Sequence, residues 1–583
     1  MRLWRTIRFG VMSGLLVAVL PLVAADDGAR SASAEDQIAQ LKAQMAAQQQ
    51  QIDQLRQALE EQRKLLGLGT RNTDTKSGAT NVAAPATFSL PATKRLGDVA
   101  STMAMVPPAA SPATPSALPY PASSQPAVSR PGDNSETSPL QLKIGNTYIT
   151  PVGFMDMTEV SRSTNPGSGI GTNFGSIPYF NTQAASLTES RLSIQNSRIG
   201  VRFDSMFNDM KVLGYWESDF LAQIGSPPNG GLAVSSNPYP LRLRLYWVDV
   251  TKGKFEFLAG QSWSMMTPNR KGISPLPGDL FYSQDIDVNY QLGLVWGRIP
   301  GFRFIFHPTS KVAFGLALEN SEPYVGGGNG GSGATLPAVI SGGANATSGA
   351  VLGGQINNGS STISAAALHP DIIAKLAFDP SSKFHFELAG VEITNKVAFP
   401  TGTAPYPTFT KAGGGGSVNL SFEIAKGVRL LTNNFWSAGG GRYIFGQAPD
   451  FIIRSNGSLS LVHSASTVTG LEANVGKTLY YVYYGGVYVA KNMALDANGT
   501  TKIGYGPISS DGQNRAIQEI TFGTNTTLVK DSKWGALNLM FQYSYLQRNP
   551  WLVTGTAPND AHVHMGFVNV RYTLPGSAPT MGK

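Results

Sequence analysis

The sequence predicts an all-β transmembrane barrel of about 16 antiparallel strands, preceded by an α-helical coiled coil and a disordered linker. Only 14% of the 583 residues are charged, yet no run of about 18 apolar residues follows the first 25. From residue 140 onward, apolar residues alternate with polar or small ones. Between these segments, short connections alternate with long connections along the chain. Because a bilayer offers backbone groups no hydrogen-bond partners, a closed barrel is the structure that fits.

The composition excludes several classes of protein. Cysteine is absent, which excludes disulfides, thiol catalysis and thiol-bound metals. The formal charge is +8, and no basic block suggests a nucleic-acid partner. The 65 glycines suit turns and tight strand packing.

Residues 1–25 have the features of a secretory signal peptide. A basic start is followed by an apolar stretch, Val11 to Val23, and by the small residues Ala24 and Ala25 before Asp26. An uncleaved anchor helix is the alternative, but the stretch is short and contains Pro21. We therefore expect the protein to be exported.

Residues 35–66 carry a seven-residue repeat that predicts a coiled coil. The first set of repeat positions holds Ile38, Met45, Ile52, Leu59 and Leu66, and the second holds Leu41, Gln48, Leu55 and Gln62. A strict period of seven keeps one stripe in register when helices wind around each other. A lone amphipathic helix, the alternative, would leave that stripe exposed to water. The repeat does not fix the number of helices.

Residues 67–139 lose all periodicity and are rich in Pro, Ala and Ser, as in Pro107 to Pro112. This composition cannot bury a core and predicts an extended linker. Its expected role is to space the coiled coil from the barrel, and a pore plug is the alternative. The barrel is predicted over 140–575, with a C-terminal tail at 576–583.

The connections distinguish a barrel from a soluble β-sandwich, which would show the same alternation. Seven tight polar turns are predicted at 206–209, 252–253, 308–311, 380–383, 426–427, 476–477 and 530–533. Long connections are predicted near 157–190, 221–240, 266–300, 320–369, 396–412, 437–455, 486–513 and 548–561. Short turns at one end and long loops at the other are typical of outer-membrane barrels. Seven hairpins with one strand added at each end give the predicted total of 16 strands.

Aromatic residues near strand ends predict belts at the lipid boundary. The candidates are Tyr480, Tyr481, Tyr483, Tyr484, Trp216, Trp247, Trp263, Trp436 and Trp534. Ordinary core aromatics are the alternative interpretation.

Charged residues on polar strand faces are the candidate pore lining, because a charge facing lipid at mid-depth costs roughly 2–4 kcal/mol. On the strand from Leu241, we expect Leu241, Leu243 and Leu245 to face lipid. Arg242, Arg244 and Tyr246 would then face inward. The full candidate set is Arg198, Arg202, Arg242, Arg244, Arg303, Glu217 and Asp219. Two interpretations stay open: an arginine ladder with a weak preference for anions, or arginines that pair with carboxylates and brace the wall.

The third long connection carries Asp279, Asp285 and Asp287 among prolines and aromatic residues. If this loop folds inward, its acids would face a basic wall at a constriction. An exposed surface loop is the alternative, and the sequence does not choose between them.

No motif predicts catalysis, a metal or a cofactor. In the segment from Gly470 to Thr478, five residues separate the two glycines where a phosphate-binding loop needs four. His562 and His564 share a strand face, but no third metal ligand is evident. A barrel hydrolase that uses Ser464 is the remaining enzyme hypothesis.

The stretch from Ser190 to Val201 resembles the second-strand signature of trimeric Gram-negative porins. The run from Leu241 to Arg244 and onward through Ala259 to Ser264 resembles the DcaP-like porin family. This resemblance covers the layout of the whole chain, although the specific motifs span only about a tenth of it. It implies a homotrimeric outer-membrane porin with a periplasmic coiled coil, which passes small anions such as dicarboxylates.

These expectations define a passive diffusion channel in the cell outer membrane, in contact with membrane lipid and lipopolysaccharide. Its N-terminal region would lie in the periplasm. The alternative is a structural protein that tethers the envelope through the coiled coil, with peptidoglycan as its partner.

Overall fold

The computed structural model describes residues 138–222, 239–276, 286–327, 333–341, 356, 367–399, 405–506, 512–553, 555–556 and 558–575. The predicted signal peptide, the coiled coil, the linker up to residue 137 and the tail 576–583 lie outside these residues. Those features stay predictions. Among the described residues, no helix is long and apolar enough to cross a membrane.

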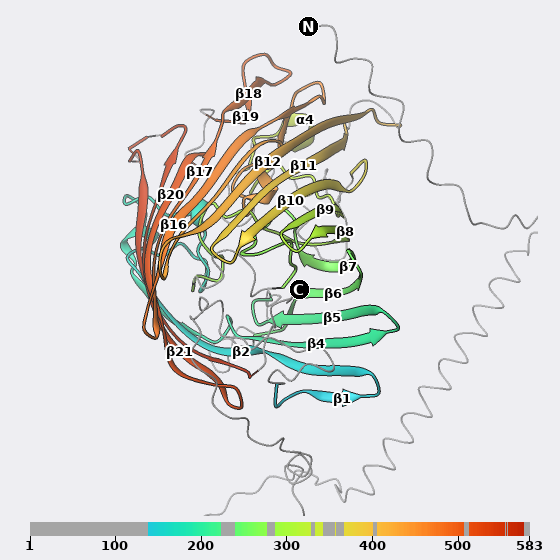
Figure 1. Cartoon of the computed structure of the whole chain (residues 1–583). Helices are drawn as coiled ribbons and strands as arrows, with labels where there is room; N and C mark the ends of the chain where they lie inside the picture. The colour runs from blue at the N-terminus through green and yellow to red at the C-terminus, as the bar shows by residue number, and fades with distance from the viewer. Residues whose placement is uncertain are drawn as a thin grey trace, which may run out of the picture. The chain divides into compact units, whose positions relative to one another are not determined.

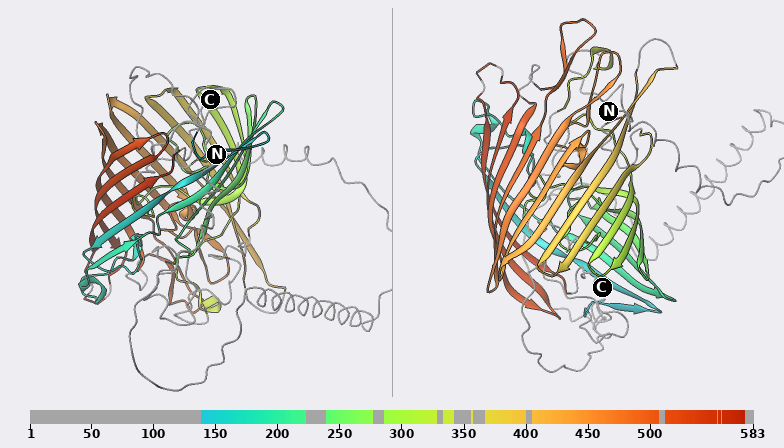
Figure 2. Two further views of the ribbon diagram at one scale, coloured as in Figure 1. Left: turned by 90° about the horizontal axis from the view of Figure 1, so that it is seen from below. Right: turned by 45° about the horizontal axis from the view of Figure 1, so that its top comes forward.

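The described chain forms a closed antiparallel barrel of 16 wall strands, as predicted, with the strands tilted against the barrel axis (Figures 1 and 2). In order around the wall they are β2 (Thr147–Arg162), β4 (Arg198–Phe207), β5 (Met210–Asp219), β6 (Arg242–Lys252), β7 (Phe255–Trp263), β8 (Arg298–Thr309), β9 (Val312–Glu319), β10 (Asp371–Ser381), β11 (Phe384–Ala398), β12 (Thr408–Ala425), β13 (Val428–Ala438), β16 (His463–Val475), β17 (Thr478–Val489), β20 (Asn514–Asp531), β21 (Gly535–Pro550) and β22 (Ala561–Thr573). Pairing of β2 with β22, from Phe154 opposite Thr573 to Arg162 opposite Met565, closes the sheet. Closure removes the open edges that a bilayer would not tolerate.

The remaining elements are short. Strand β3 (Glu189–Ser193) pairs with the C-terminal part of β2, whereas β4 pairs with the N-terminal part of the same strand. Strand β1 (Leu142–Ile144) pairs with the start of β2. Two small hairpins and four short helical turns lie in the long connections: β14 (Phe451–Ile453) with β15 (Leu459–Leu461), β18 (Asn492–Leu495) with β19 (Lys502–Tyr505), η2 (Phe174–Ser176), η3 (Ala184–Ser186), α4 (Ala338–Ser341) and η5 (Gly441–Tyr443).

All seven predicted tight turns join adjacent wall strands. In each case the two strands pair directly beside the turn, as Phe207 pairs with Met210 and Lys252 with Phe255. The long connections occupy the opposite ends of the strands. Several strands extend further than predicted: β11 reaches Ala398, and β12 begins at Thr408.

The barrel wall is apolar outside and polar inside, as the alternation predicted. Large apolar residues are exposed on the outer face, and examples from around the wall are Phe203, Leu243, Phe257, Phe302, Leu316, Leu388, Phe522, Phe541 and Val570. Charged and amide side chains are buried on the inner face, among them Glu217, Arg303, Lys375, Glu387, Asn419 and Glu472. An apolar exterior of this kind matches hydrocarbon.

The prediction of aromatic belts is correct only in part. Tyr480 and Tyr484 on β17 are exposed outside, at 48% and 43%, and Trp436 and Trp534 are exposed at 57% and 73%. By contrast Tyr481, Tyr483, Trp247 and Trp263 are buried inside the barrel. Successive residues of a strand point to opposite faces, so a run of four nearby tyrosines cannot all face lipid.

The prediction for one strand face was wrong because β6 carries a bulge. Opposite β5, Glu217 pairs with Leu245 and the next residue, Ser218, pairs with Leu243. Arg244 is therefore the extra residue, and the alternation reverses after it. Leu245 is fully buried inside, and Tyr246 is 65% exposed on the outer face, the reverse of the expectation.

Candidate functional site

The third long connection folds into the barrel. We call residues 264–297 the inner loop; it joins β7 to β8 and is described at 264–276 and 286–297. Most of its described residues are buried, including Met265, Ile286 and Leu292. The open question from the sequence is thus answered in favour of an inward loop.

Side chains of the inner wall hold the backbone of the inner loop. Five of its N–H groups donate to wall acceptors: Met265 to Glu319 at 2.6 Å, Asn269 to Glu387 at 3.1 Å, Gly272 to Asp379 at 2.9 Å, Ile286 to Gln542 at 3.4 Å and Leu292 to Glu519 at 2.9 Å. These acceptors come from β9, β10, β11, β20 and β21. Loop amides need such partners, because a buried N–H without an acceptor is costly.

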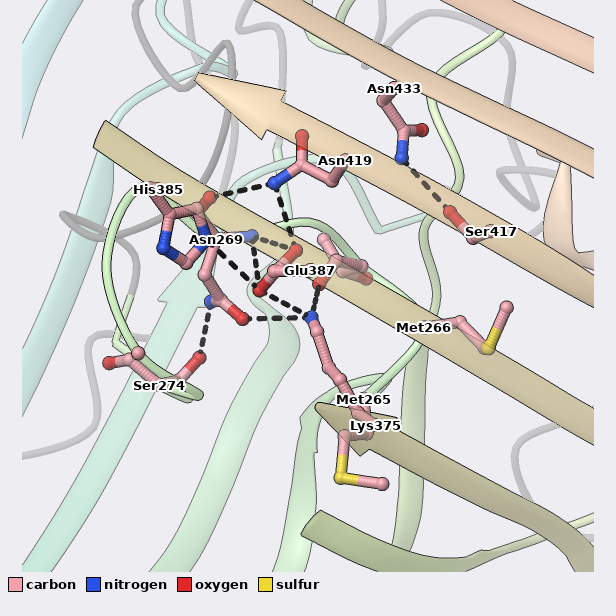
Figure 3. Close-up of polar contacts among 12 residues, drawn as sticks. Met265, Met266, Asn269, Ser274, Lys375, His385, Glu387, Ser417, Asn419 and Asn433 are labelled. Carbon is pink, nitrogen blue, oxygen red and sulfur yellow. Dashed lines mark hydrogen bonds and ion pairs between the residues drawn. The ribbon is translucent and has the colours of Figure 1, made fainter. Parts of the chain in front are cut away.

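One anchor of the inner loop is the network around Glu387 (Figure 3). Lys375 Nζ lies 2.8 Å from the Glu387 carboxylate and also donates to the Thr267 carbonyl at 2.8 Å. Asn419 Nδ2 donates to Glu387 at 2.9 Å and to the Asn269 carbonyl at 3.1 Å. Lys375 and Glu387 side chains are 1% and 2% exposed. This buried pair ties three wall strands to the loop.

A second ion pair attaches the inner loop to a distant wall strand. Arg270 binds the Glu472 carboxylate of β16 through two hydrogen bonds, at 3.0 and 2.8 Å. The loop leaves the wall between β7 and β8, which lie far from β16 in the order of strands. The loop therefore spans the barrel and narrows it.

The far end of the loop rests on glycines of β17. A Cβ on Gly485 would collide with the carbonyl oxygen of Leu292, and a Cβ on Gly293 would meet the carbonyl oxygens of Thr467 and Gly486. Gly293 has a φ of +85°. Only residues without side chains permit this approach of loop to wall.

We predict that Gly485→Val pushes the segment around Leu292 off β17 and raises single-channel conductance in planar bilayers. Overpacking of this kind costs typically about 1–3 kcal/mol. Gly390→Val on β11 is the matched control, since a Cβ there meets only Gly415 O at 3.8 Å. Equal conductance of the two variants would contradict the seating of the loop on β17.

The predicted acids of this loop do not form an open acidic face in the described part. Asp279 and Asp285 lie outside the described residues. Asp287 is 2% exposed and accepts hydrogen bonds from the Thr172 hydroxyl and, at 2.9 Å, from the Asn289 amide. Burial raises the pKa of the Asp287 carboxyl. Asp287 thus joins the inner loop to the first long connection, because its oxygens are used for that contact.

Five of the seven predicted lumen residues form one compact group with two residues that were not predicted. We call the group the arginine cluster: Arg198, Arg242, Arg244, Arg298, Glu217, Asp219 and Tyr290. Arg244 bridges both acids, with Nε 2.8 Å from Glu217 and Nη1 2.6 Å from Asp219. Arg242 pairs with Asp219 at 2.7 Å, and Arg198 lies 3.6 Å from Glu217. Four arginines face two carboxylates, so two positive charges remain in excess.

The other two predicted arginines are paired elsewhere on the wall. Arg202 binds Asp204 on its own strand at 2.6 Å, and Arg303 lies 3.9 Å from Glu319. Each of these two arginines thus has a carboxylate partner on the wall. In the arginine cluster, ion pairs are also present, but the positive charges outnumber the negative ones.

Tyr290 links the inner loop to the arginine cluster. Its hydroxyl accepts hydrogen bonds from Arg198 and Arg244, each at 3.1 Å. Its backbone has a φ of +61°, which is unusual for a bulky residue. Burial would raise the pKa of the Tyr290 hydroxyl, but the charges of Arg198, Arg244 and Arg298 outweigh burial and lower it. Arginine contacts thus fix the position of the loop against the wall.

This arrangement predicts a pH dependence. When Tyr290 loses its proton, a negative charge enters the arginine cluster, so any preference for anions should weaken as pH rises. Because the pKa is lowered, the change should begin below the range in which an exposed tyrosine titrates, near 10. Reversal potentials measured from pH 7 upward test this. Tyr290→Phe should remove the transition, and its persistence in that variant would refute the assignment.

Sequence reasoning missed Arg298, Tyr290, Lys375 and Glu387. Arg298 is the first residue of β8, the strand that also carries the predicted Arg303. As a charged residue on that strand, it could have been predicted to face inward. Glu387 alternates with Phe386 and Leu388, which marks it as inward-facing. For Tyr290 the sequence offers no signal, because its place depends on where the inner loop folds.

The groups gathered beside the inner loop are charged side chains and hydrogen-bonding side chains. Within the described ranges, no group of three or more His, Asp or Glu residues is arranged to hold a metal. Ser464 hydrogen-bonds Ser437 at 2.9 Å, and Ser437 is not a catalytic base. The arrangement offers fixed positive charge beside a narrowed passage.

Comparison with known proteins shows the fold. No family model matches the chain, and no curated protein does. The outer membrane channel DcaP of Acinetobacter baumannii is similar in structure, with a TM-score of 0.51 and 14% identity over 74% of this chain and 98% of that one. The anion-selective porin from Comamonas acidovorans has a TM-score of 0.41 and 11% identity over 73% and 99% of the two chains. Vibrio cholerae OmpT in its trimer form has a TM-score of 0.37 and 10% identity over 73% and 99%. The resemblance to DcaP that the sequence motifs predicted is thus confirmed at the level of fold.

Proposed function

We propose that the protein is an outer-membrane porin, a passive diffusion channel for small hydrophilic solutes that favours anions such as dicarboxylates. The observation that carries this proposal is the arginine cluster, whose two excess positive charges stand beside the inner loop inside a barrel with an apolar exterior. Fixed charge at a narrow point selects ions by sign. DcaP is an outer membrane channel of the same fold.

We further propose that the chain forms a homotrimer in the outer membrane, among membrane lipid and lipopolysaccharide, with its N-terminal region in the periplasm. A polar patch on the outer wall supports subunit contact. Glu159 accepts hydrogen bonds from Ser161 at 2.6 Å and from Ser190 at 3.0 Å, and Tyr543 bonds His564 at 2.7 Å nearby. A carboxylate facing hydrocarbon is unfavourable, so a second subunit is the better neighbour for this patch.

Planar-bilayer recording of the purified full chain tests the proposal. We expect conductance in steps that close in triplets and, in a salt gradient, a reversal potential of the sign that indicates anions. Absence of conductance would refute the channel, whereas a clear cation preference would refute only the selectivity.

A further inference from the structure

Another long connection also folds into the barrel interior. It follows β13, and we call residues 439–450 the second inner loop. Its residues Tyr443, Ile444 and Ala448 are each at most 1% exposed. The loop returns tightly on itself at Gly441, where a Cβ would collide with the carbonyl oxygen of Ala448. The lumen is therefore narrowed from a second part of the wall.

The two loops meet across the lumen. The Trp296 N–H donates to the Tyr443 carbonyl at 3.0 Å, and Trp296 is the parallel bridge partner of Ile444. The rings of Trp296 and Phe445 stack, with centroids 4.9 Å apart and 22° between their planes. Phe174 of the first long connection meets the Phe445 ring edge-on, at 6.2 Å between centroids. Strands β9 to β12 separate β8 from β13 in the wall, so these contacts cross the interior.

The base of the second inner loop is attached to the wall. Arg442 donates from Nη2 to Asn395 of β11 at 3.1 Å and from Nε to Asp450 at 2.8 Å. The ring of Phe445, at the tip of the loop, instead contacts aromatic rings of the other two inward connections. If those contacts break, the tip is released while the base stays in place.

The backbone at the contact is in a conformation that bulky residues rarely adopt. Phe445 has a φ of +56°, and Tyr290, whose ring lies 5.6 Å from that of Trp296, has a φ of +61°. Such a backbone persists only where its surroundings hold it. Gly446, with a φ of +65°, follows Phe445 directly and can absorb a change of backbone angles. The tip thus has a reason to relax once its aromatic contacts are lost.

We infer that Trp296 and Phe445 form an aromatic gate that sets the size of the largest solute to pass. With the gate closed, the two loops are joined across the lumen by a hydrogen bond and a stacked pair of rings. When Phe445 withdraws by rotation at Gly446, Arg442 keeps the base attached and the passage widens. Apolar constrictions control passage through pores in this way. The inference rests on the proposed function for the passage itself, and it names the residues that limit solute size rather than charge.

Thiol labelling tests the release of the tip without relying on conductance. The chain has no cysteine, so Ile444→Cys introduces a single thiol at a position that is 1% exposed. The purified full chain in detergent is treated with N-ethylmaleimide, and labelling is followed by mass spectrometry with and without Phe445→Ala. We expect Phe445→Ala to speed labelling by about tenfold, because only the open form reacts and the aromatic contacts that oppose opening are lost.

A second thiol controls for general loosening of the protein. Val462→Cys lies at the end of the same connection, beyond the second inner loop, and Val462 is also fully buried. Phe445→Ala should leave the labelling of this thiol unchanged. If Phe445→Ala does not fold, Phe445→Leu takes its place, since leucine keeps much of the volume but has no ring.

Planar-bilayer recordings with polyethylene glycols of increasing size measure the width of the passage. Phe445→Ala should raise the conductance by about twofold and admit larger polymers, because a wider constriction restricts ions and polymers less. Phe302→Ala is the matched control. Phe302 also stacks on an aromatic partner, Phe257, at 6.2 Å and 21°, but both rings lie on the outer face. This control should change neither the conductance nor the size limit.

The outcomes separate the gate from the proposed function. Unchanged labelling of the Ile444→Cys thiol overturns the gate, and so does faster labelling in a channel whose size limit stays the same. Faster labelling together with a larger size limit supports the gate. Faster labelling in a protein that conducts in neither form supports the release of the tip and overturns only the proposed function.

Discussion

Replacing Glu387 with glutamine is expected to release the inner loop and to lower the free energy of unfolding by about 3–5 kcal/mol. The change removes the one carboxylate that faces Lys375 at 2.8 Å. Lys375 is buried, so its charge would remain without compensation. The amide of Asn269 and the side chain of Asn419 would also exchange a charged acceptor for a neutral one.

The expected consequence in bilayers is a larger and noisier single-channel conductance, because the loop would lose its main attachment to β11. Denaturant unfolding in detergent, followed by tryptophan fluorescence, measures the stability. Glu392→Gln is the matched control: Glu392 lies on the same strand, its side chain is 46% exposed and its partner is His369 at 3.6 Å. If both variants unfold at the same denaturant concentration, the network of Figure 3 does not hold the loop.

The double variant Arg198→Gln with Arg242→Gln is expected to abolish the preference for anions. It removes the two excess charges of the arginine cluster and leaves Arg244 bridging both carboxylates, at 2.8 and 2.6 Å. Arg298 also remains. The acids therefore keep a partner, and the barrel should fold.

The size of the effect follows from Coulomb's law. A unit charge about 10 Å from a passing ion in water contributes about 0.4 kcal/mol, which is about a factor of two in favour of an anion and the same against a cation. Each charge therefore changes the anion-to-cation permeability ratio by about fourfold, and two charges should change it by about 16-fold at low salt and by less at high salt.

Reversal potentials in a potassium chloride gradient measure this ratio. The control is Arg202→Gln with Asp204→Asn, which removes one charge of each sign from a pair on the same wall strand. The control should keep the selectivity of the unmodified protein. A double variant in the arginine cluster that keeps it as well would show that the selective charge lies elsewhere.

The sequence by itself determined the barrel wall. Alternation along a strand is a local property with a period of two, and it correctly assigned Arg198, Arg202 and Arg303 to the inner face. Turns are local too, which is why all seven hairpin connections and the number of wall strands could be predicted.

Only the tertiary structure decided what the inner face does. The bulge at Arg244 depends on the register of the partner strand, so the sequence of β6 alone put Leu245 and Tyr246 on the wrong faces. The course of the inner loop depends on contacts such as Arg270 with Glu472, 202 residues apart. A pattern along the chain cannot carry such information, because the energy of an ion pair depends on distance in space and on burial.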